Sequence, residues 1–372
     1  MRIKFIVILS VFIVACSSPD IEKKEEEVKT SDSLENKDTP IFTKLDEESG
    51  FDFVNELIET STSNVLRYEY MYNGSGVAIG DINNDGLPDI FMGGNFFGGR
   101  LYLNKGNLKF EQISDNAGVF FAGFSTGVSF VDINNDGYDD IYICRSKSNN
   151  VEERRNILLI NNKDLTFTNR ASEYGVDDPG FASNAIFMDY DNDLDLDLFI
   201  LNHRNDFNNS SILPIHGNEY PFEVSDINYC SNRLYKNEDG KFRDVSVEAG
   251  VQTNRFGLGV FAEDINNDGW VDIYVANDFN DQDQLLINNG KGKFVDQIDK
   301  YFDHISKNSM GCEVGDYNND GLEDIVTLDM TPEHNYRQKQ LRGAVTYDMY
   351  HLGLSRGLGH QVIRNCLHVN EG

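Results

Sequence analysis

Acidic and amide side chains recur at a fixed spacing in five short segments of the chain. The segments begin at Asp81, Asp132, Asp189, Asp264 and Asp316, and they read DINNDGLPD, DINNDGYDD, DYDNDLDLD, DINNDGWVD and DYNNDGLED. Each places an oxygen-bearing side chain at positions 1, 3, 5 and 9, and four have a turn-forming glycine at position 6. Oxygen donors at this spacing are what a hard cation such as Ca²⁺ requires. The sequence therefore predicts up to five bound calcium ions.

The candidate side-chain ligands are the four oxygen-bearing residues of each segment. They are Asp81, Asn83, Asp85 and Asp89; Asp132, Asn134, Asp136 and Asp140; Asp189, Asp191, Asp193 and Asp197; Asp264, Asn266, Asp268 and Asp272; and Asp316, Asn318, Asp320 and Asp324. The third segment departs from the others, because Asp191 replaces asparagine and Leu194 replaces glycine. Leucine at such a turn adds strain, for which the extra carboxylate can compensate.

Short apolar runs surround every segment and indicate the elements that hold it. A small apolar run precedes each loop, a β-rich run follows it, and two further runs separated by a Gly/Asn turn complete the first four repeats. The loops recur at intervals of 51, 57, 75 and 52 residues. Four strands in each unit of about 50 residues are typical of a β-propeller blade. An EF-hand needs flanking helices and a carboxylate at position 12, where this chain has Met92, Ile143, Ile200, Val275 and Thr327.

Loop and strand pattern together resemble the FG-GAP/VCBS repeats of integrin-α-type β-propellers. Within these, the chain is similar to bacterial lipoproteins related to the cartilage acidic protein and ASPIC/UnbV group, over Phe42 to Gly372. The resemblance implies an all-β propeller in which the backbone carbonyl at position 7 is a further calcium ligand. Those carbonyls belong to Leu87, Tyr138, Asp195, Trp270 and Leu322.

We expect the propeller to occupy residues 41–372, with blades near 74–114, 125–170, 182–246, 257–298 and 310–372. The fifth blade is incomplete, because its fourth strand is missing, whereas Ile41–Leu45 resembles a fourth strand without a blade. That strand could complete the fifth blade and close a five-bladed ring. Alternatively, the chain is a fragment of a longer, seven-bladed propeller, which is the interpretation we favour.

Residues 1–16 have the features of a targeting segment. Arg2 and Lys4 precede a short apolar stretch that ends at Ala15-Cys16, a sequence that resembles a bacterial lipobox. We therefore expect lipidation of Cys16; cleavage of a plain signal peptide is the alternative. Residues 17–40 are almost entirely polar and predict a disordered tether. This predicts a lipid-anchored protein of the bacterial cell envelope, at the outer membrane, that contacts the membrane through its anchor only.

Composition limits the other partners. The formal net charge is −30, and much of it lies in the five loops. Nucleic-acid binding needs basic patches, which the sequence lacks, so it is excluded. Cys144, Cys230, Cys312 and Cys366 show no CxxC spacing; we expect buried thiols, with disulfides as the alternative.

Long insertions predict where a ligand would bind. In a propeller blade, loops between the second and third strands lie on the face opposite the calcium loops, and here they are long: 145–155, 202–230, 277–283 and 329–364. Candidate ligand residues on this face are His203, Arg204, Tyr220, Tyr336, Arg337, Tyr347, Tyr350 and Arg356. Alternatively, these side chains pack into small cores of their own.

The histidines show no metal-hydrolase spacing, and no nucleophile signature stands beside them, so we do not expect an enzyme. The sequence predicts a binding or adhesion module for a glycan or protein ligand. The alternatives are a polysaccharide hydrolase or lyase on a propeller scaffold, and a purely structural envelope module.

Overall fold

The computed structural model describes residues 44–209, 212–213, 227–332, 334–340 and 347–372. Within these, the segment from Leu45 to Gly372 forms one compact unit. The predicted targeting segment, Cys16 and the tether lie outside the described residues. No described helix is both long enough and apolar enough to cross a bilayer.

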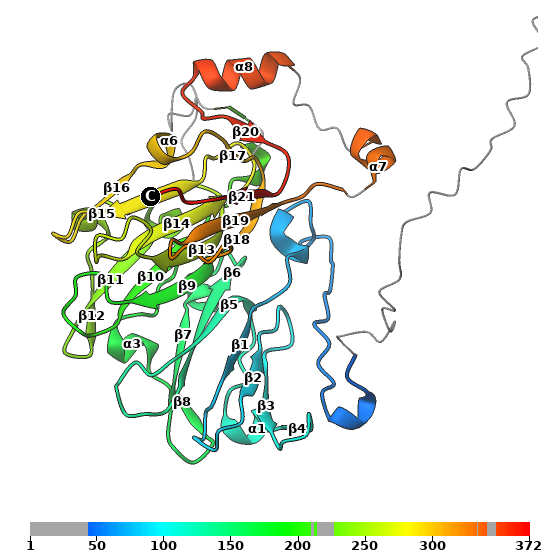
Figure 1. Ribbon diagram of the computed structural model, residues 1–372. Helices are drawn as coiled ribbons and strands as arrows, with labels where there is room; N and C mark the ends of the chain where they lie inside the picture. Colours follow the sequence, from blue (N-terminus) through cyan, green and yellow to red (C-terminus); the bar gives the residue numbers. More distant parts are fainter. Residues whose placement is uncertain (1–43, 210–211, 214–226, 333, 341–346) are drawn as a thin grey trace, which may run out of the picture. The chain divides into compact units, whose positions relative to one another are not determined.

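Five antiparallel sheets follow one another in chain order, from cyan through green and yellow to orange in Figure 1. Their strands are β1 (Val77–Gly80), β2 (Asp89–Met92), β3 (Arg100–Asn104) and β4 (Phe110–Gln112); β5 (Phe124–Val131), β6 (Asp140–Ser146), β7 (Ile157–Asn161) and β8 (Phe167–Asn169); β9 (Ala182–Met188), β10 (Asp197–Asn202), β11 (Arg233–Glu238) and β12 (Lys241–Asp244); β13 (Gly257–Glu263), β14 (Asp272–Asn277), β15 (Gln284–Asn288) and β16 (Phe294–Asp296); and β18 (Ser309–Gly315), β19 (Asp324–Asp329) and β21 (Cys366–His368). The predicted all-β propeller fold is confirmed, with five blades.

Short helices lie between and within the blades. Those after a fourth strand are α1 (Ser114–Ala117), α3 (Ala171–Tyr174), α5 (Ser246–Ala249) and α6 (Ile298–Tyr301). The insertions carry α2 (Val151–Arg154), η3 (Phe207–Asn209), α4 (Ile227–Cys230), α7 (Asn335–Gln340) and α8 (Tyr347–Ser355), and the segment before the first blade carries η1 (Glu47–Ser49) and η2 (Glu69–Tyr72). Two short strands, β17 (Ile305–Ser306) and β20 (Gln361–Val362), pair in parallel.

The apolar core is divided among the interfaces between blades. One buried cluster joins blades 1 and 2 through residues such as Leu101 and Ile141, and the next joins blades 2 and 3 through Tyr142 and Leu198. Two further clusters join blades 3 and 4 and blades 4 and 5. Alternate residues of a strand therefore face different neighbouring blades, which explains why the second strands are apolar without a break.

First strands of consecutive blades pack against one another, from β1 through β5, β9 and β13 to β18. Gly127 and Gly259 stand where neighbouring strands approach closely: a Cβ at Gly127 would lie 2.8 Å from Cα of Asn184, and one at Gly259 would lie 2.9 Å from Cα of Gly311. Only glycine fits such contacts without displacing the neighbouring strand.

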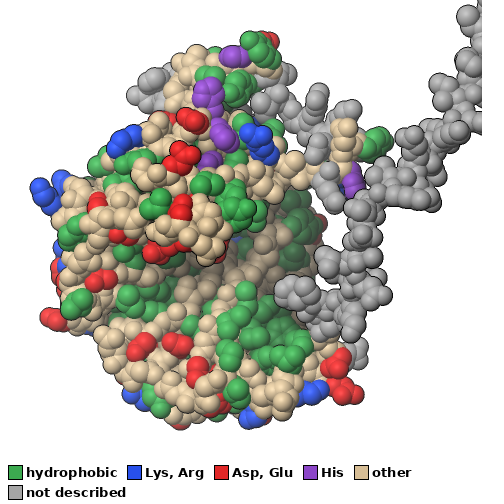
Figure 2. Space-filling view, in the orientation of Figure 1, with side chains coloured by type: hydrophobic (Ala, Val, Ile, Leu, Met, Phe, Trp, Pro, Cys, Tyr) green, Lys and Arg blue, Asp and Glu red, His purple; other side chains and the backbone are tan. Residues whose placement is uncertain are grey.

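The first and last described blades do not pack together as the consecutive blades do. Val77 and Ile79 of β1 are 52% and 64% exposed, and Figure 2 shows hydrophobic side chains gathered over the first blade. In the fifth blade, β21 pairs with β19, and the described residues contain no fourth strand beside it. The seven-bladed ring stays a prediction.

Candidate functional site

The five acidic loops are the turns between the first and second strands of their blades. In the first loop the carboxylate of Asp81 accepts the backbone N–H groups of Asp85 at 3.1 Å and Gly86 at 2.8 Å. The same two bonds, from positions 5 and 6 to position 1, recur in the other four loops at 2.7–3.1 Å. The local backbone therefore orients the position-1 carboxylate.

Two residues of each turn have a left-handed backbone. The position-4 asparagines have φ between 56° and 60°, and the position-6 glycines have φ between 82° and 87°. Asparagine and glycine adopt this conformation most readily. Leu194, at position 6 of the third loop, has φ of 74° and is 89% exposed, so it keeps the turn at a conformational cost.

The position-9 aspartate is buried in every loop and ties the loop to the third strand. In the first blade Asp89 accepts the N–H of Ile82 at 3.1 Å and that of Asn104 at 2.7 Å. Asn161, Asn237, Asn288 and Asn370 make the equivalent bond to the position-9 aspartates of their own blades. Burial raises the pKa of Asp89 to about 6 and that of Asp140 to about 7. A bound cation would offset this cost of burying a charge.

Asparagines at the end of the third strand, or just after it in the fifth blade, also connect neighbouring loops. The Asn161 side chain donates to the carbonyl of Ile82 in the preceding blade at 2.8 Å. Asn288 donates to Tyr190 at 2.8 Å, and Asn370 donates to Ile265 at 3.0 Å. Sequence reasoning missed these residues, although an asparagine at the same place in every repeat was a usable signal.

The donor set of the loops fits Ca²⁺. The ligand positions offer carboxylate oxygens, joined in four of the five loops by an asparagine amide oxygen, and no histidine or cysteine, which suits a hard cation of six to eight oxygen ligands. In the fourth loop, Oδ2 of Asp272 is buried and faces the N–H of Ile265, as the position-9 carboxylates of the other loops face the N–H at position 2. Asp264, Asn266, Asp268 and Asp272, with the carbonyl of Trp270, would hold the ion, and the corresponding residues would do so in the first, second and fifth loops.

The third loop has a lysine beside its candidate ligands. Asp189, Asp191 and Asp197 can bring one carboxylate oxygen each within 4.8 Å of the others. However, Nζ of Lys236 in β11 forms an ion pair with Asp191 and lies 2.9 Å from Oδ2 of Asp193. Burial lowers the pKa of Lys236, but its hydrogen bonds to Asp191 and Asp193 outweigh this and hold it above the usual range.

On the opposite face, a cavity of about 870 Å³ lies among the loops of the first three blades. Its lining combines aromatic side chains with amide and hydroxyl groups: half-buried Phe96 and the buried rings of Phe124, Phe181 and Phe207 are accompanied by Asn64, Asn95, Asn149, Asn205 and Asn208. Nζ of Lys147 lies 4.4 Å from the centroid of the Phe96 ring and donates to Oγ of Ser63 at 2.5 Å. Lys147 has φ of 69°, a strained conformation of the kind that clusters at binding sites. These lining residues come from six separate segments, two of which lie in the insertions 145–155 and 202–230 that were predicted to form the ligand face; none of them was among the candidate ligand residues.

His203 and Arg204, two predicted ligand residues, are buried beneath this cavity, each 1% exposed. Nδ1 of His203 lies 2.6 Å from the carbonyl oxygen of Arg204, which can only accept, so Nδ1 carries the proton. Nε2 is then an acceptor, 2.9 Å from Oγ of Ser146. Arg204 makes a two-pronged contact with Asp206 at 2.7 and 2.8 Å. Both side chains belong to a small core around Tyr68 and Tyr70.

The other predicted face residues lie on the last insertion, apart from Tyr220, which is outside the described residues. Tyr336 and Arg337 are exposed on α7, and Tyr347 is exposed on α8, with its ring centroid 4.1 Å from that of His351. The Tyr350 hydroxyl lies 2.6 Å from Nδ1 of His360, and Figure 2 shows histidines gathered at and below α8. Arg356 donates to the carbonyl of Leu213 at 3.5 Å.

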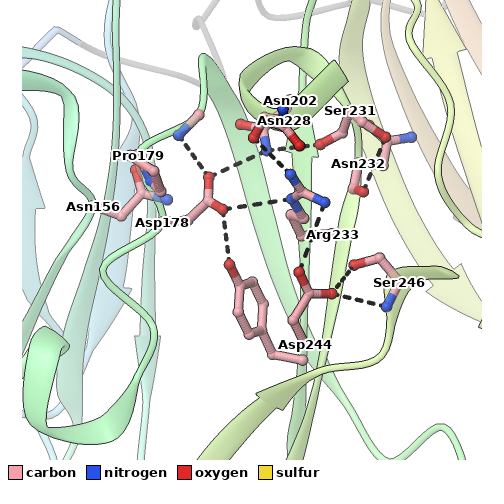
Figure 3. A network of polar contacts seen from close by, with 12 residues as sticks. Asn156, Asp178, Pro179, Asn202, Asn228, Ser231, Asn232, Arg233, Asp244 and Ser246 are labelled. Carbon is pink, nitrogen blue, oxygen red and sulfur yellow. Dashed lines mark hydrogen bonds and ion pairs between the residues drawn. The ribbon is translucent and has the colours of Figure 1, made fainter. Parts of the chain in front are cut away.

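A buried polar network anchors the insertion of the third blade (Figure 3). Asp178 accepts the Tyr235 hydroxyl at 2.8 Å and the N–H of Gly180 at 2.8 Å, and it lies 3.9 Å from Nε of Arg233. Arg233 donates to the carbonyl of Asn228 at 2.6 Å, at the end of the insertion. Burial raises the pKa of Asp178 although these partners lower it. The network is a structural support for the face.

Comparison with known proteins agrees with this architecture. The FG-GAP-like repeat family matches residues 81–143, 223–275 and 264–327. Cartilage acidic protein 1 of Xenopus tropicalis is 25% identical over 311 residues, that of mouse 27% over 312 and that of human 26% over 311. Each alignment covers 77% of this chain and 44–45% of the relative, so the chain spans less than half of their length.

Among solved structures, the Vibrio cholerae biofilm matrix protein Bap1 aligns with 68% of this chain and 34% of its own, at 12% identity and a TM-score of 0.35. The repeat matches include the first, second, fourth and fifth acidic loops and the strands beside them. The chain contains FG-GAP-like repeats, folds as a β-propeller and is similar to cartilage acidic protein 1.

Proposed function

We propose that this protein is a calcium-stabilised binding module of the bacterial cell envelope, anchored through a lipid on Cys16, that binds a glycan on its insertion face. The cavity on that face carries the proposal. Sugar rings are bound by aromatic side chains together with amide and hydroxyl groups, and both line the cavity, with Phe96 as its half-buried ring. A concave cavity of about 870 Å³ suits a short oligosaccharide better than the flat surface of a protein partner.

A binding role fits the cavity better than glycoside hydrolysis. Hydrolysis of a glycosidic bond generally uses two carboxyl groups on either side of the bond. Among the described residues that line the cavity, Glu153 is the only acidic one. We therefore place the protein among binding or adhesion proteins rather than among hydrolases and lyases.

The binding proposal can be tested on a glycan array, with affinities of the best ligands then measured by calorimetry. Phe96→Ala removes a ring face, and Lys147→Ala removes a charged hydrogen-bond donor. We expect each to weaken binding about tenfold or more. Lys291→Ala is the matched control, because Lys291 is exposed in the turn after β15, away from the cavity. Unchanged affinity in both cavity variants, or no glycan ligand at all, would refute the proposal.

The calcium proposal predicts a large stabilisation by the ion. A site saturated at a hundred times its dissociation constant contributes about 2.7 kcal/mol, and several such sites act together. We expect EDTA to lower the melting temperature by more than about 10 °C, and added Ca²⁺ to restore it. Asp268→Ala should reduce the shift, whereas Asp115→Ala, on α1 outside any loop, should not. An EDTA-insensitive melting temperature would refute calcium binding.

A further inference from the structure

The third blade has two charged residues, one in its acidic loop and one in β11, that the other four blades lack and that lie side by side in space. Position 3 is asparagine in four loops and Asp191 in the third. The residue just before the third-strand asparagine is Leu103, Ile160, Ile287 or Val369 in the other blades, and it is Lys236 in the third. The hydrogen bonds from those asparagines to the position-9 aspartates fix this alignment. An extra negative charge and a new positive charge therefore occur together, 45 residues apart in the chain.

The structure brings these two charges into contact at the place where an ion would bind. Nζ of Lys236 pairs with the carboxylate of Asp191 at position 3 and lies 2.9 Å from Oδ2 of Asp193 at position 5. The Lys236 side chain is 23% exposed and that of Asp191 is 21% exposed, so the pair is largely screened from water. In the first and fifth loops the position-3 asparagine instead donates to the position-5 aspartate, at 3.0 and 2.8 Å.

A lysine also lies near the acidic loop of the second blade, but it does not form the same half-buried ion pair with positions 3 and 5. Nζ of Lys163 lies 3.4 Å from Oδ2 of Asp136, at position 5, but its side chain is 46% exposed in a turn. Position 3 of that loop is Asn134, which brings no charge to a lysine. Lys163 can therefore move into solvent when an ion binds, whereas the stem of Lys236 lies in β11 and points at two ligand positions.

We propose that the Lys236 ammonium group takes the place of Ca²⁺ in the third loop, so that four loops bind calcium and the third is held by an internal ion pair. An ammonium group and a divalent cation repel each other and would compete for the same oxygens of Asp191 and Asp193. The third loop then keeps its conformation when calcium is removed, while the other four loosen. The proposal rests on calcium binding by the other loops.

Counting the bound ions tests the proposal directly. Protein equilibrated with Ca²⁺ and freed of loosely bound ions is expected to hold four calcium ions by elemental analysis. Lys236→Met keeps the aliphatic stem and removes the charge, so it should bind a fifth ion between Asp189, Asp191, Asp193 and Asp197. Lys163→Met is the matched control and should still bind four, and Asp85→Ala should bind three.

Hydrogen exchange gives a second measurement that needs no substitution. The N–H groups of Asp193 and Leu194 are bonded to Asp189, as the equivalent groups are in the other loops. In EDTA, these two amides should stay protected in the natural protein, while protection in the other four loops falls. In Lys236→Met, the third loop should become calcium-dependent as well.

The outcomes separate this proposal from the calcium proposal on which it rests. Five ions in the natural protein, four in Lys236→Met, or loss of third-loop protection in EDTA would each overturn the role of Lys236. Absence of bound calcium from every protein would instead refute calcium binding by the propeller, and this inference with it.

Discussion

At the scale of single residues, aspartates of one loop have different surroundings. Asp85, at position 5, is exposed, whereas Asp89, at position 9, is fully buried and accepts two backbone N–H groups. The sequence spacing predicts both aspartates as calcium ligands and does not distinguish their surroundings. Their difference comes from the sheet, because position 9 begins the second strand and turns its side chain toward the third. A position-9 aspartate therefore supports the blade as well as a bound ion.

His203 is the residue whose protonation should matter most for the insertion face. Burial lowers its pKa from 6.5 to about 4, and its Nε2 faces the hydroxyl groups of Ser146 and Tyr68. The charged pair of Arg204 and Asp206 lies beside it. Between pH 6.5 and 4 the unfolded chain binds a proton that the folded protein does not bind, so this histidine makes the protein less stable as pH falls.

We predict that His203→Gln loses less stability on acidification than the natural protein does. The difference between their free energies of unfolding should change by about 2 kcal/mol between pH 7.5 and pH 5. Urea titrations at the two pH values measure it, with calcium at a saturating concentration. His334→Gln, which alters an exposed histidine of the last insertion, should show no such change. Parallel pH dependence in the natural protein and His203→Gln would contradict a neutral, buried His203.

At the scale of elements, each blade depends on bonds that connect its loops to its strands. In the third blade, Asp178 precedes β9, Tyr235 and Arg233 lie in β11, and Asn228 belongs to α4 (Figure 3). The network therefore joins the end of a long insertion to the strands beneath it. A comparable bond from Tyr102 to Asp52, at 2.8 Å, ties the segment before the first blade to β3.

We predict that Tyr235→Phe destabilises the propeller by about 1–2 kcal/mol, because it leaves a buried carboxylate of Asp178 with one hydrogen bond fewer. Chemical denaturation followed by tryptophan fluorescence would measure the loss. Tyr317→Phe is the matched control, since Tyr317 is 69% exposed, and it should change stability little. Equal effects of the two substitutions would show that the network contributes nothing to stability.

At the scale of the whole molecule, stability is spread over the interfaces between neighbouring blades. Each of the four interfaces described contains an apolar cluster. Three of them also contain a side-chain hydrogen bond from the asparagine that ends or follows the third strand to the acidic loop of the preceding blade. Calcium loops and blade interfaces are thus coupled, because Asn161, Asn288 and Asn370 contact both. Removal of calcium should therefore weaken the packing of blades and not only the loops themselves.

Repetition made the fold and the loops predictable. Strand order, loop position and the left-handed turn residues all follow from contacts within about fifty residues, and five copies separate the shared pattern from chance. The exclusion of an EF-hand depended only on position 12 and on the flanking strands. The insertions and the segment before the first blade occur once each, so no repeated pattern could indicate how they pack. Lys147 lies in a predicted insertion, but its contact with Phe96 and the burial of Tyr68 escaped prediction.

The sequence by itself determined the propeller, its repeated blades and the oxygen-rich loops, because these depend on local alternation and spacing. Only the tertiary structure decided that His203 and Arg204 are buried, that rings and amides from separate segments share one cavity, and that Lys236 reaches the third loop. Those facts depend on side chains brought together by strand pairing across 40 residues or more, which residue order alone does not specify.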